Sequence, residues 1–216
     1  MPALAIKSLA LSPVNADEIF AGSGSTSNFG LAGNPGFGVV WSGDGGVNWE
    51  VRAASTFTGS VINSIVPTTL QSGRVVLAAT DPSAGGVWRS INSGKTFTKI
   101  SGTLGIPGGG VSSLVADDTN PKFFFAALPA STIVSPGDEG VYRSIDGGVS
   151  WVKTTLSLPA GSNRILLSVG KHTGVIFAMT IGPSGTLKDV SRSADHGVTW
   201  TSLGVPEPSH LSRWAG

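Results

Sequence analysis

Short hydrophobic runs recur along the chain and are separated by segments rich in Gly, Pro, Asn and Asp. One set of runs comprises Ile6–Ala10, Ile62–Val66, Val111–Val115 and Ile165–Val169. A second set follows each of these and comprises Ile19–Gly22, Val76–Ala79, Phe124–Ala127 and Ile176–Met179. Runs of about five residues bounded by turn-forming residues predict short strands, and therefore an all-β fold.

A polar turn motif that ends in an aromatic residue follows each pair of runs. Its form is Ser-x-Asp/Asn-x-Gly-x-x-Trp/Phe, and its copies read SGDGGVNW from Ser42, SINSGKTF from Ser90, SIDGGVSW from Ser144 and SADHGVTW from Ser193. The steps between the copies are 48, 54 and 49 residues. Self-similarity at this period predicts a repeat architecture, with four antiparallel strands, A to D, in each repeat.

The residue types of the motif predict a tight hairpin between strands C and D. A glycine permits positive φ in each turn, at Gly46, Gly94, Gly148 and Gly197. An acidic or amide side chain can accept backbone hydrogen bonds there, at Asp44, Asn92, Asp146 and Asp195. An aromatic ring is expected to anchor the returning strand, at Trp49, Phe97, Trp151 and Trp200. We therefore interpret the four acidic and amide residues as structural and not as catalytic.

The motif resembles the Asp-box, or BNR repeat, of sialidase-like β-propellers. The resemblance runs from about Ala3 to Gly204, and the second copy departs from it at Asn92 and Phe97. It implies a β-propeller of four four-stranded antiparallel blades, at about residues 3–54, 59–101, 110–157 and 161–204. In style the chain looks most like bacterial extracellular propellers with many blades, which implies an extracellular or cell-surface location in a bacterium. The tail at residues 205–216 breaks the pattern and is expected to be irregular.

Four blades raise the question of how the ring closes, because each blade buries both faces against its neighbours. Two arrangements are expected. One is a compact ring of four blades. The other is part of a larger propeller, in which two copies could form a homodimer that closes a ring of eight blades. The abrupt start at Leu4, without a leader, favours the second arrangement.

Composition excludes several classes of function. The 216 residues include 14 basic and 13 acidic side chains, so bulk charge gives no reason to expect a nucleic-acid partner. There is no Cys and no apolar run long enough to span a membrane. The histidines His172, His196 and His210 lack metal-ligand spacing, so they predict no metal site. Calcium is conceivable at the Asp138–Glu139 loop, but EF-hand spacing is absent. No phosphate-loop motif is present either, and no cofactor is expected.

Connections between strands B and C vary most in length, and variable loops on a rigid scaffold commonly carry function. Counted from strand B to the motif serine, the steps are 22, 13, 19 and 16 residues. Candidate catalytic carboxylates in these loops are Asp81, Asp138, Glu139 and Asp189. Candidate substrate-binding residues are Asn28, Phe29, Asn34, Phe37 and Lys188. Carboxylates, amides and aromatic rings are the groups that bind sugars, but they are also ordinary loop residues.

Two functions follow from this loop face. The first is a scaffold that binds a glycan or a protein through the B–C loops. The alternative is a glycoside hydrolase that cleaves a polysaccharide with two loop carboxylates, similar to xyloglucan-cleaving propeller enzymes. A sialidase is disfavoured because Tyr142 is the only tyrosine and occupies a repeated strand position. Arg89, Arg143 and Arg192 likewise precede motif serines and do not suggest a converging arginine triad.

Overall fold

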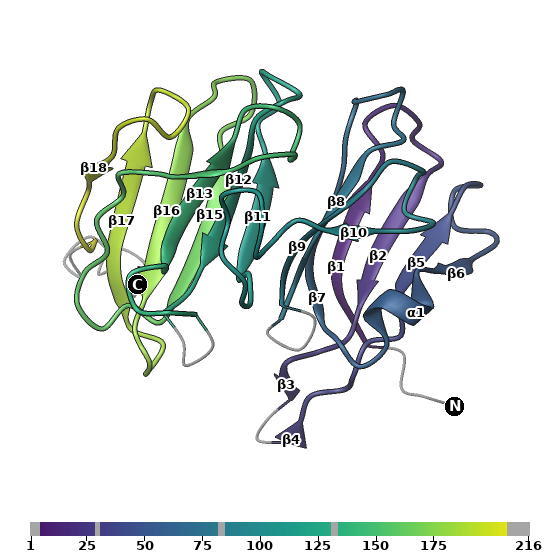
Figure 1. Cartoon of the computed structure of the whole chain (residues 1–216), viewed down its shortest axis with the longest axis horizontal. Coiled ribbons are helices and arrows are strands. Elements are labelled where there is room, and N and C mark those ends of the chain that lie inside the picture. Colours follow the sequence, from purple (N-terminus) through teal and green to yellow (C-terminus); the bar gives the residue numbers. More distant parts are fainter. Residues whose placement is uncertain (1–4, 29–30, 82–84, 131–133, 207–216) are drawn as a thin grey trace, which may run out of the picture.

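The computed structural model describes residues 5–28, 31–81, 85–130 and 134–206, which form four antiparallel sheets of four strands each (Figure 1). The first sheet contains β1 (Ile6–Leu11), β2 (Ile19–Ser23), β5 (Val39–Ser42) and β6 (Glu50–Arg52). The second contains β7 (Ile62–Pro67), β8 (Val76–Thr80), β9 (Gly86–Ser90) and β10 (Thr98–Lys99). The third contains β11 (Ser113–Ala116), β12 (Phe124–Leu128), β13 (Gly140–Ser144) and β14 (Val152–Lys153). The fourth contains β15 (Arg164–Val169), β16 (Ile176–Ile181), β17 (Leu187–Ser193) and β18 (Thr201–Ser202).

Each sheet keeps its strands in chain order, as an antiparallel meander. Such consecutive four-stranded sheets are the blades of a β-propeller. The fold is therefore an all-β propeller, as the repeats predicted.

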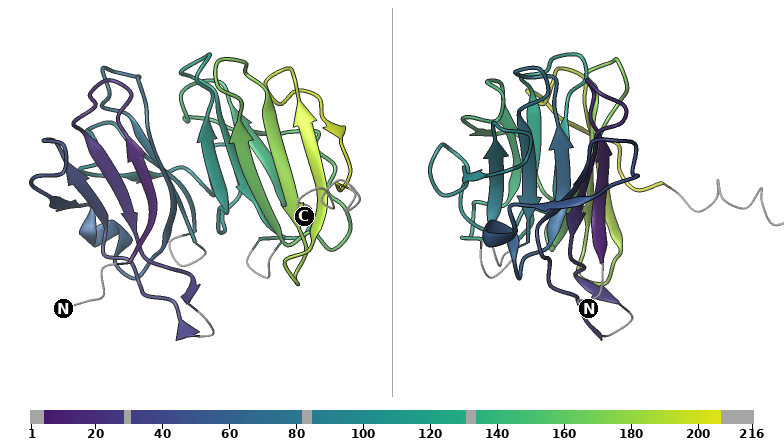
Figure 2. Two further views of the ribbon diagram at one scale, coloured as in Figure 1. Left: turned by 180° about the vertical axis from the view of Figure 1, so that it is seen from behind. Right: turned by 90° about the vertical axis from the view of Figure 1, so that its right-hand side faces the viewer.

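Neighbouring sheets pack through their first strands, so that β1, β7, β11 and β15 line the inside in that order. Figures 1 and 2 together show the sheets following one another in an arc, with the first and the fourth at its two ends. Within the described residues, these two end sheets do not pack against each other as neighbouring sheets do. Of the two arrangements expected, the structure therefore has the open one, and the compact ring of four blades is wrong.

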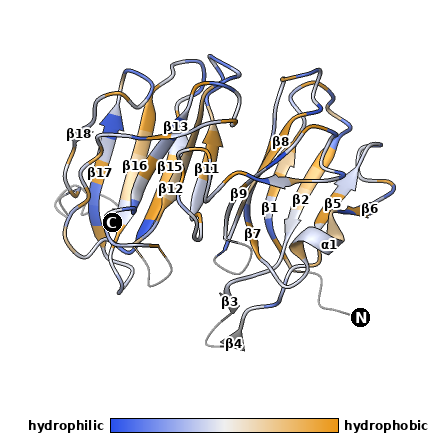
Figure 3. Cartoon of the chain, viewed as in Figure 1, coloured by the Kyte–Doolittle hydropathy of each residue, from blue (hydrophilic) through white to orange (hydrophobic). Residues whose placement is uncertain are grey.

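Hydrophobic side chains fill the three spaces between successive sheets. The middle strand of one sheet contributes a large, fully buried residue, at Phe20, Leu77 and Phe125. The facing sheet places the motif glycine of its hairpin against that residue, at Gly94, Gly148 and Gly197 respectively. The same period therefore sets both the hairpin and the junction between blades. Figure 3 shows the contrast within the fourth sheet between hydrophobic β16 and more hydrophilic β17.

Side-chain hydrogen bonds also join neighbouring inner strands. Ser8 Oγ donates to the Ile62 carbonyl over 3.0 Å. Ser64 Oγ accepts from the Leu114 N–H at 3.2 Å, and Ser113 Oγ accepts from the Leu167 N–H at 3.1 Å. A small hydroxyl at this position can reach the next backbone, which explains why serine recurs in the first hydrophobic runs.

Two local elements lie outside the repeat. The short helix α1 (Ala54–Phe57) follows the first sheet and places Phe57 in the space before the second. The Phe57 ring lies 5.1 Å from the Phe97 ring and 5.4 Å from the Trp88 ring, in edge-on arrangements. The strands β3 (Ser27–Asn28) and β4 (Leu31–Ala32) pair within the first B–C connection. Among the described residues, no helix has the length and apolar character needed to cross a membrane.

Candidate binding face

A groove runs along the axis of the arc at the end where the four inner strands begin. Its volume is about 530 Å³, and residues from β1, β7, β11 and β15 or their immediate approaches all line it. Thr26 and Pro129, from the first and third B–C connections, complete the wall. The strand register explains this position, because the end of β2 pairs with the start of β1, as Ser23 does with Ile6. The groove therefore opens on the face that carries the B–C loops.

Several polar groups of the groove are already used to hold the sheets together. Ser64 and Ser113 make the bonds between inner strands described above, and Ser112 Oγ donates to the Ile165 carbonyl over 2.7 Å. The Asn63 amide donates to the Val111 carbonyl over 2.9 Å, which leaves its own oxygen as an acceptor. These contacts make the wall rigid, and a rigid wall suits a preformed binding site.

Two cationic side chains line the groove, one from the first sheet and one from the fourth. Lys7 comes from β1, Arg164 comes from β15, and both side chains are exposed. Lys7 Nζ lies 3.4 Å from Thr26 Oγ1, an uncharged partner. None of the described residues that line the groove is Asp or Glu. Positive charge without a lining carboxylate favours a ligand that carries negative charge.

A smaller pocket of about 310 Å³ lies beside the groove, and Thr26 lines both. Asp81, at the end of β8, lines this pocket together with Asn34 and Ser25 from the first B–C connection. The fold thus brings together two of the residues predicted from the sequence, Asp81 and Asn34, from different blades. Phe37, three residues after Asn34, is half-buried. Its N–H donates to Ser23 Oγ over 2.8 Å.

The other two residues predicted in this connection are Asn28 and Phe29. Asn28 lies in β3, and Phe29 lies outside the described residues.

Asp138 and Glu139 belong to a loop that is held by a hydrogen bond within the loop and by a second one from strand β14. Glu139 Oε2 accepts from the Gly137 N–H over 2.8 Å, and Lys153 Nζ donates to the Gly137 carbonyl. Backbone N–H groups of Glu139 itself and of Gly137 lower the pKa of the Glu139 carboxyl. A lowered pKa is the opposite of what a general acid needs in glycoside hydrolysis. Neither carboxylate lines the axial groove.

Lys188 and Asp189 lie within strand β17, and the sequence-based assignment of both to a loop is wrong. The strand begins at Leu187 because the preceding strand, β16, extends to Ile181 and pairs with it. Asp189 is buried and accepts from Ser191 Oγ, from Ser202 Oγ and from the Gly204 N–H at 3.1 Å. Burial raises its pKa, but these hydrogen bonds outweigh that effect and lower it. Asp189 therefore stabilises the outer hairpin in this structure.

Tyr142 is buried between the second and third sheets, and its hydroxyl donates to the Asp138 carbonyl over 2.8 Å. Burial, together with the nearby charges of Asp138 and Glu139, raises the pKa of Tyr142 to about 12. A phenol held in its neutral form is a poor nucleophile. Its packing agrees with the sequence-based argument against a sialidase.

The four motif turns share one hydrogen-bond pattern. The serine Oγ donates to the acidic or amide side chain over 2.8–2.9 Å, as Ser144 does to Asp146. The same serine Oγ accepts from the motif glycine N–H over 2.8–2.9 Å. The acidic or amide oxygen also accepts a backbone N–H four residues later over 2.8–3.0 Å. Each turn is thus closed by side chains from its own motif.

Sequence reasoning missed one member of this pattern. The residue just before the aromatic position has a polar side chain that bonds the acidic or amide side chain, at Asn48, Thr96, Ser150 and Thr199. A signal for it was present, because all four copies carry an amide or hydroxyl there. The motif is better written with this polar residue included as its fifth defined position.

The aromatic anchors differ according to their place in the arc. Trp151 is only 2% exposed in the core between the second and third sheets, and Phe97 and Trp200 pack against neighbouring cores. Trp49 is 47% exposed, because no sheet formed by the described residues lies on its side of the first sheet.

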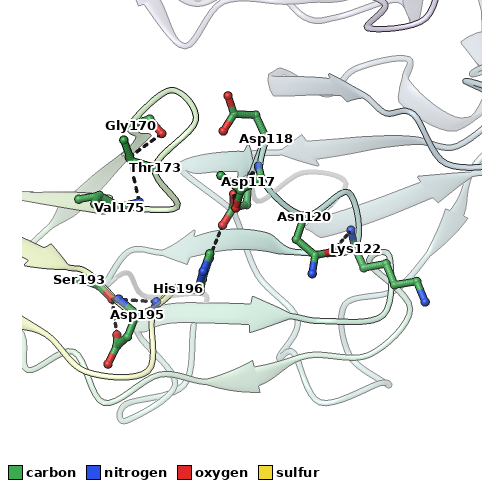
Figure 4. A network of polar contacts seen from close by, with 12 residues as sticks. Asp117, Asp118, Asn120, Lys122, Gly170, Thr173, Val175, Ser193, Asp195 and His196 are labelled. Carbon is green, nitrogen blue, oxygen red and sulfur yellow. Dashed lines mark hydrogen bonds and ion pairs between the residues drawn. The ribbon is translucent and has the colours of Figure 1, made fainter.

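A second polar cluster lies at the opposite end of the sheets (Figure 4). Buried Asp117 accepts from the Thr119 N–H at 2.8 Å and from Thr119 Oγ1 at 2.6 Å, and lies 2.7 Å from His196 Nδ1. Burial raises the Asp117 pKa, but the bonds from Thr119 and His196 lower it by more. Because His196 belongs to the fourth motif turn, the pair ties the third sheet to the fourth.

Among the described residues, no group of three or more His, Asp or Glu side chains is placed to hold an ion.

Solved structures with propeller folds resemble the chain closely in shape and distantly in sequence. The GH74 enzyme of Niastella koreensis aligns with a TM-score of 0.64 at 18% identity, over 93% of this chain and 30% of the enzyme. The GH74 xyloglucanase of Xanthomonas campestris gives 0.62 at 18% identity, over 95% and 31% respectively. YCF48 of Cyanidioschyzon merolae gives 0.58 at 15% identity, over 94% and 57%.

The chain thus spans about a third of the two GH74 enzymes and just over half of YCF48. No family model matches the sequence, and no curated protein matches it. At these identities the likeness establishes the propeller fold alone.

Proposed function

We propose that the chain is a non-catalytic binding scaffold whose axial groove and side pocket take an acidic glycan. The observation that carries this proposal is the groove lining. All four blades contribute polar groups, two of these are the exposed cations Lys7 and Arg164, and none of the described lining residues is a carboxylate. Asp81 and Asn34 in the adjoining pocket supply an acceptor and an amide for sugar hydroxyls.

Among the similar structures, the GH74 xyloglucanase supports a polysaccharide ligand, whereas YCF48 bound to a D1 peptide supports a protein ligand. The alternative, hydrolysis, needs two carboxyls across one groove, about 5 Å or about 6.5–9.5 Å apart, with one of raised pKa. Asp81, Asp138, Glu139 and Asp189 lie in different surroundings, and two of them have lowered pKa values. Binding needs no such pair of carboxyls, and we therefore favour it over hydrolysis.

Binding to a panel of polysaccharides tests the proposal. We expect uronic-acid polymers to bind and neutral polymers to bind more weakly, with affinity falling as salt rises, because exposed charges are screened. Lys7→Ala and Arg164→Ala should each weaken binding by roughly tenfold, the effect of losing about 1.4 kcal/mol. Lys171→Ala removes an exposed cation from the A–B turn of the fourth sheet and should leave affinity unchanged. If Lys7→Ala and Arg164→Ala both bind as tightly as Lys171→Ala and the unmodified chain, the groove is not the binding site.

The same panel distinguishes the hydrolase. Release of reducing sugar by the unmodified chain, lost in Asp81→Asn or Asp138→Asn and retained in Asp189→Asn, would replace the binding proposal with catalysis. Selective binding to an acidic peptide in place of every polysaccharide would instead assign a protein ligand.

A further inference from the structure

The two end faces of the arc carry the two halves of a junction that the chain makes three times internally. At each internal junction, a large residue in the middle of one sheet packs against the motif glycine of the next. The pairs are Phe20 with Gly94, Leu77 with Gly148 and Phe125 with Gly197. The corresponding residues on the two end faces are Phe177 of the fourth sheet, which is half-buried, and Gly46 of the first. Among the described residues, neither one faces a further sheet.

An arginine also donates to the neighbouring motif turn at two of the three internal junctions, from β6 at the first and from β9 at the second. At the first junction, Arg52 donates to the Ser93 carbonyl in the next motif turn. At the second, Arg89 Nε donates to the Gly147 carbonyl, at the equivalent turn position, over 2.9 Å. Arg192 occupies the Arg89 position in the fourth sheet and is exposed. The equivalent acceptor in the first sheet is the carbonyl of Gly45.

Apolar exposure marks the outward face of the first sheet. Leu9 is 69% exposed, whereas the residues in its place in the second and third sheets, Ile65 and Leu114, are 5% and 3% exposed. Leu9 points away from the second sheet, because its neighbour Ala10 packs toward that sheet and strand side chains alternate. Leu11, Val51 and Trp49 are exposed around the same sheet. This is the type of surface that the internal junctions bury.

The opposite end has a matching face. Met179 is 40% exposed and points away from the third sheet, because the adjacent Ala178 packs toward it. Leu166 and Val190 pair with Met179 on the neighbouring strands and so share its face. Arg192 adds a donor to this face.

We propose that two copies of this chain associate head to tail, the fourth sheet of each against the first sheet of the other, and close a ring of eight blades. A second copy is the occupant that the geometry favours, because this chain carries both halves of the contact. Two identical junctions related by a two-fold axis would leave neither end face uncovered. Each junction would place Phe177 against Gly46, and Arg192 near the carbonyl of Gly45.

Sedimentation equilibrium of the purified chain over a wide concentration range tests the proposal. We expect a dimer. A monomer at every concentration would overturn the proposal, and so would trimers or open-ended assemblies, because they would mean that two copies do not close the ring.

Charge variants test the contact itself. Leu9→Glu and Met179→Glu each place a carboxylate in both junctions, and each should make the chain monomeric with an unchanged circular dichroism spectrum. Val152→Glu, at an exposed residue of the third sheet, is the matched control and should stay dimeric. Mixing the Leu9→Glu and Met179→Glu chains should restore a heterodimer, because one junction then contains only natural faces. Failure of the mixture to associate, or dimers that survive both substitutions, would refute the head-to-tail arrangement.

Discussion

At the scale of single residues, each motif turn is stabilised by one acceptor that several donors share. Asp146 accepts from Ser144 Oγ and from both the N–H and the hydroxyl of Ser150. Asn92 fills the same place in the second turn, where its amide donates to Thr96 Oγ1 in place of accepting from it. The hydroxyl partner can reverse its role, so the turn tolerates an amide as well as a carboxylate.

This tolerance predicts different outcomes for two substitutions at one position. Asp146→Ala removes the shared acceptor, and we expect the free energy of unfolding at pH 7 to fall by about 1–3 kcal/mol. Asp146→Asn keeps the acceptor oxygen and should cost less than half as much. Urea unfolding followed by tryptophan fluorescence measures both. Equal losses for the two variants would contradict the account of the turn.

The same variants have a defined dependence on pH. Burial raises the pKa of Asp146, but its hydrogen bonds with Ser150 and Ser144 lower it by more. A carboxyl with a lowered folded-state pKa contributes stability that is fully present above its unfolded pKa of about 4, and that is lost as pH falls through the folded value. The unmodified chain should therefore lose its advantage over Asp146→Asn below about pH 4. A constant difference between them from pH 7 to pH 2 would contradict this.

At the scale of elements, a motif glycine can be required by the backbone of its turn, by packing against the neighbouring sheet, or by both. Gly46 and Gly148 both have positive φ, at 90° and 78°. A Cβ on Gly148 would lie 2.5 Å from Leu77 Cδ2 of the neighbouring sheet, whereas a Cβ on Gly46 would make only ordinary contact with Trp49 at 3.4 Å. The backbone requirement is common to both positions, whereas the packing requirement applies at Gly148 and not at Gly46.

Gly148→Ala should therefore destabilise the chain more than Gly46→Ala. Both substitutions cost about 1–2 kcal/mol for the left-handed backbone. Overpacking at the junction should add a further 1–3 kcal/mol, roughly, at Gly148 alone. Thermal unfolding of a monomeric Met179→Glu background keeps the end-face contact out of the comparison. A larger loss at Gly46 would contradict the assignment of these glycines.

The sequence predicts elements where the residue pattern repeats. The inner and middle strands and the motif turns follow from periodicity, since each repeat must bury the same faces. The helix α1 and the pair β3 and β4 occur once, so no repeated pattern marks them. Asp189 was misplaced because strands β16 and β17 extend further than their counterparts, which a loop-rich composition around Gly182 conceals.

At the scale of the whole molecule, the groove could not be predicted from any single repeat. Lys7, Asn63 and Arg164 belong to different blades and share no residue type. They come together because every inner strand begins at the same end of the arc. The repeat therefore fixes where a binding face must lie, while the unrepeated residues at the strand starts determine what that face can hold.

Hydrogen–deuterium exchange with and without a bound uronic-acid polymer tests the binding face most directly. Binding in the groove predicts slower exchange at the starts of β1, β7, β11 and β15 and in the first B–C connection, with no change in the A–B turns around Asp117 and His172. Protection confined to those A–B turns, or to the outer hairpins, would contradict it.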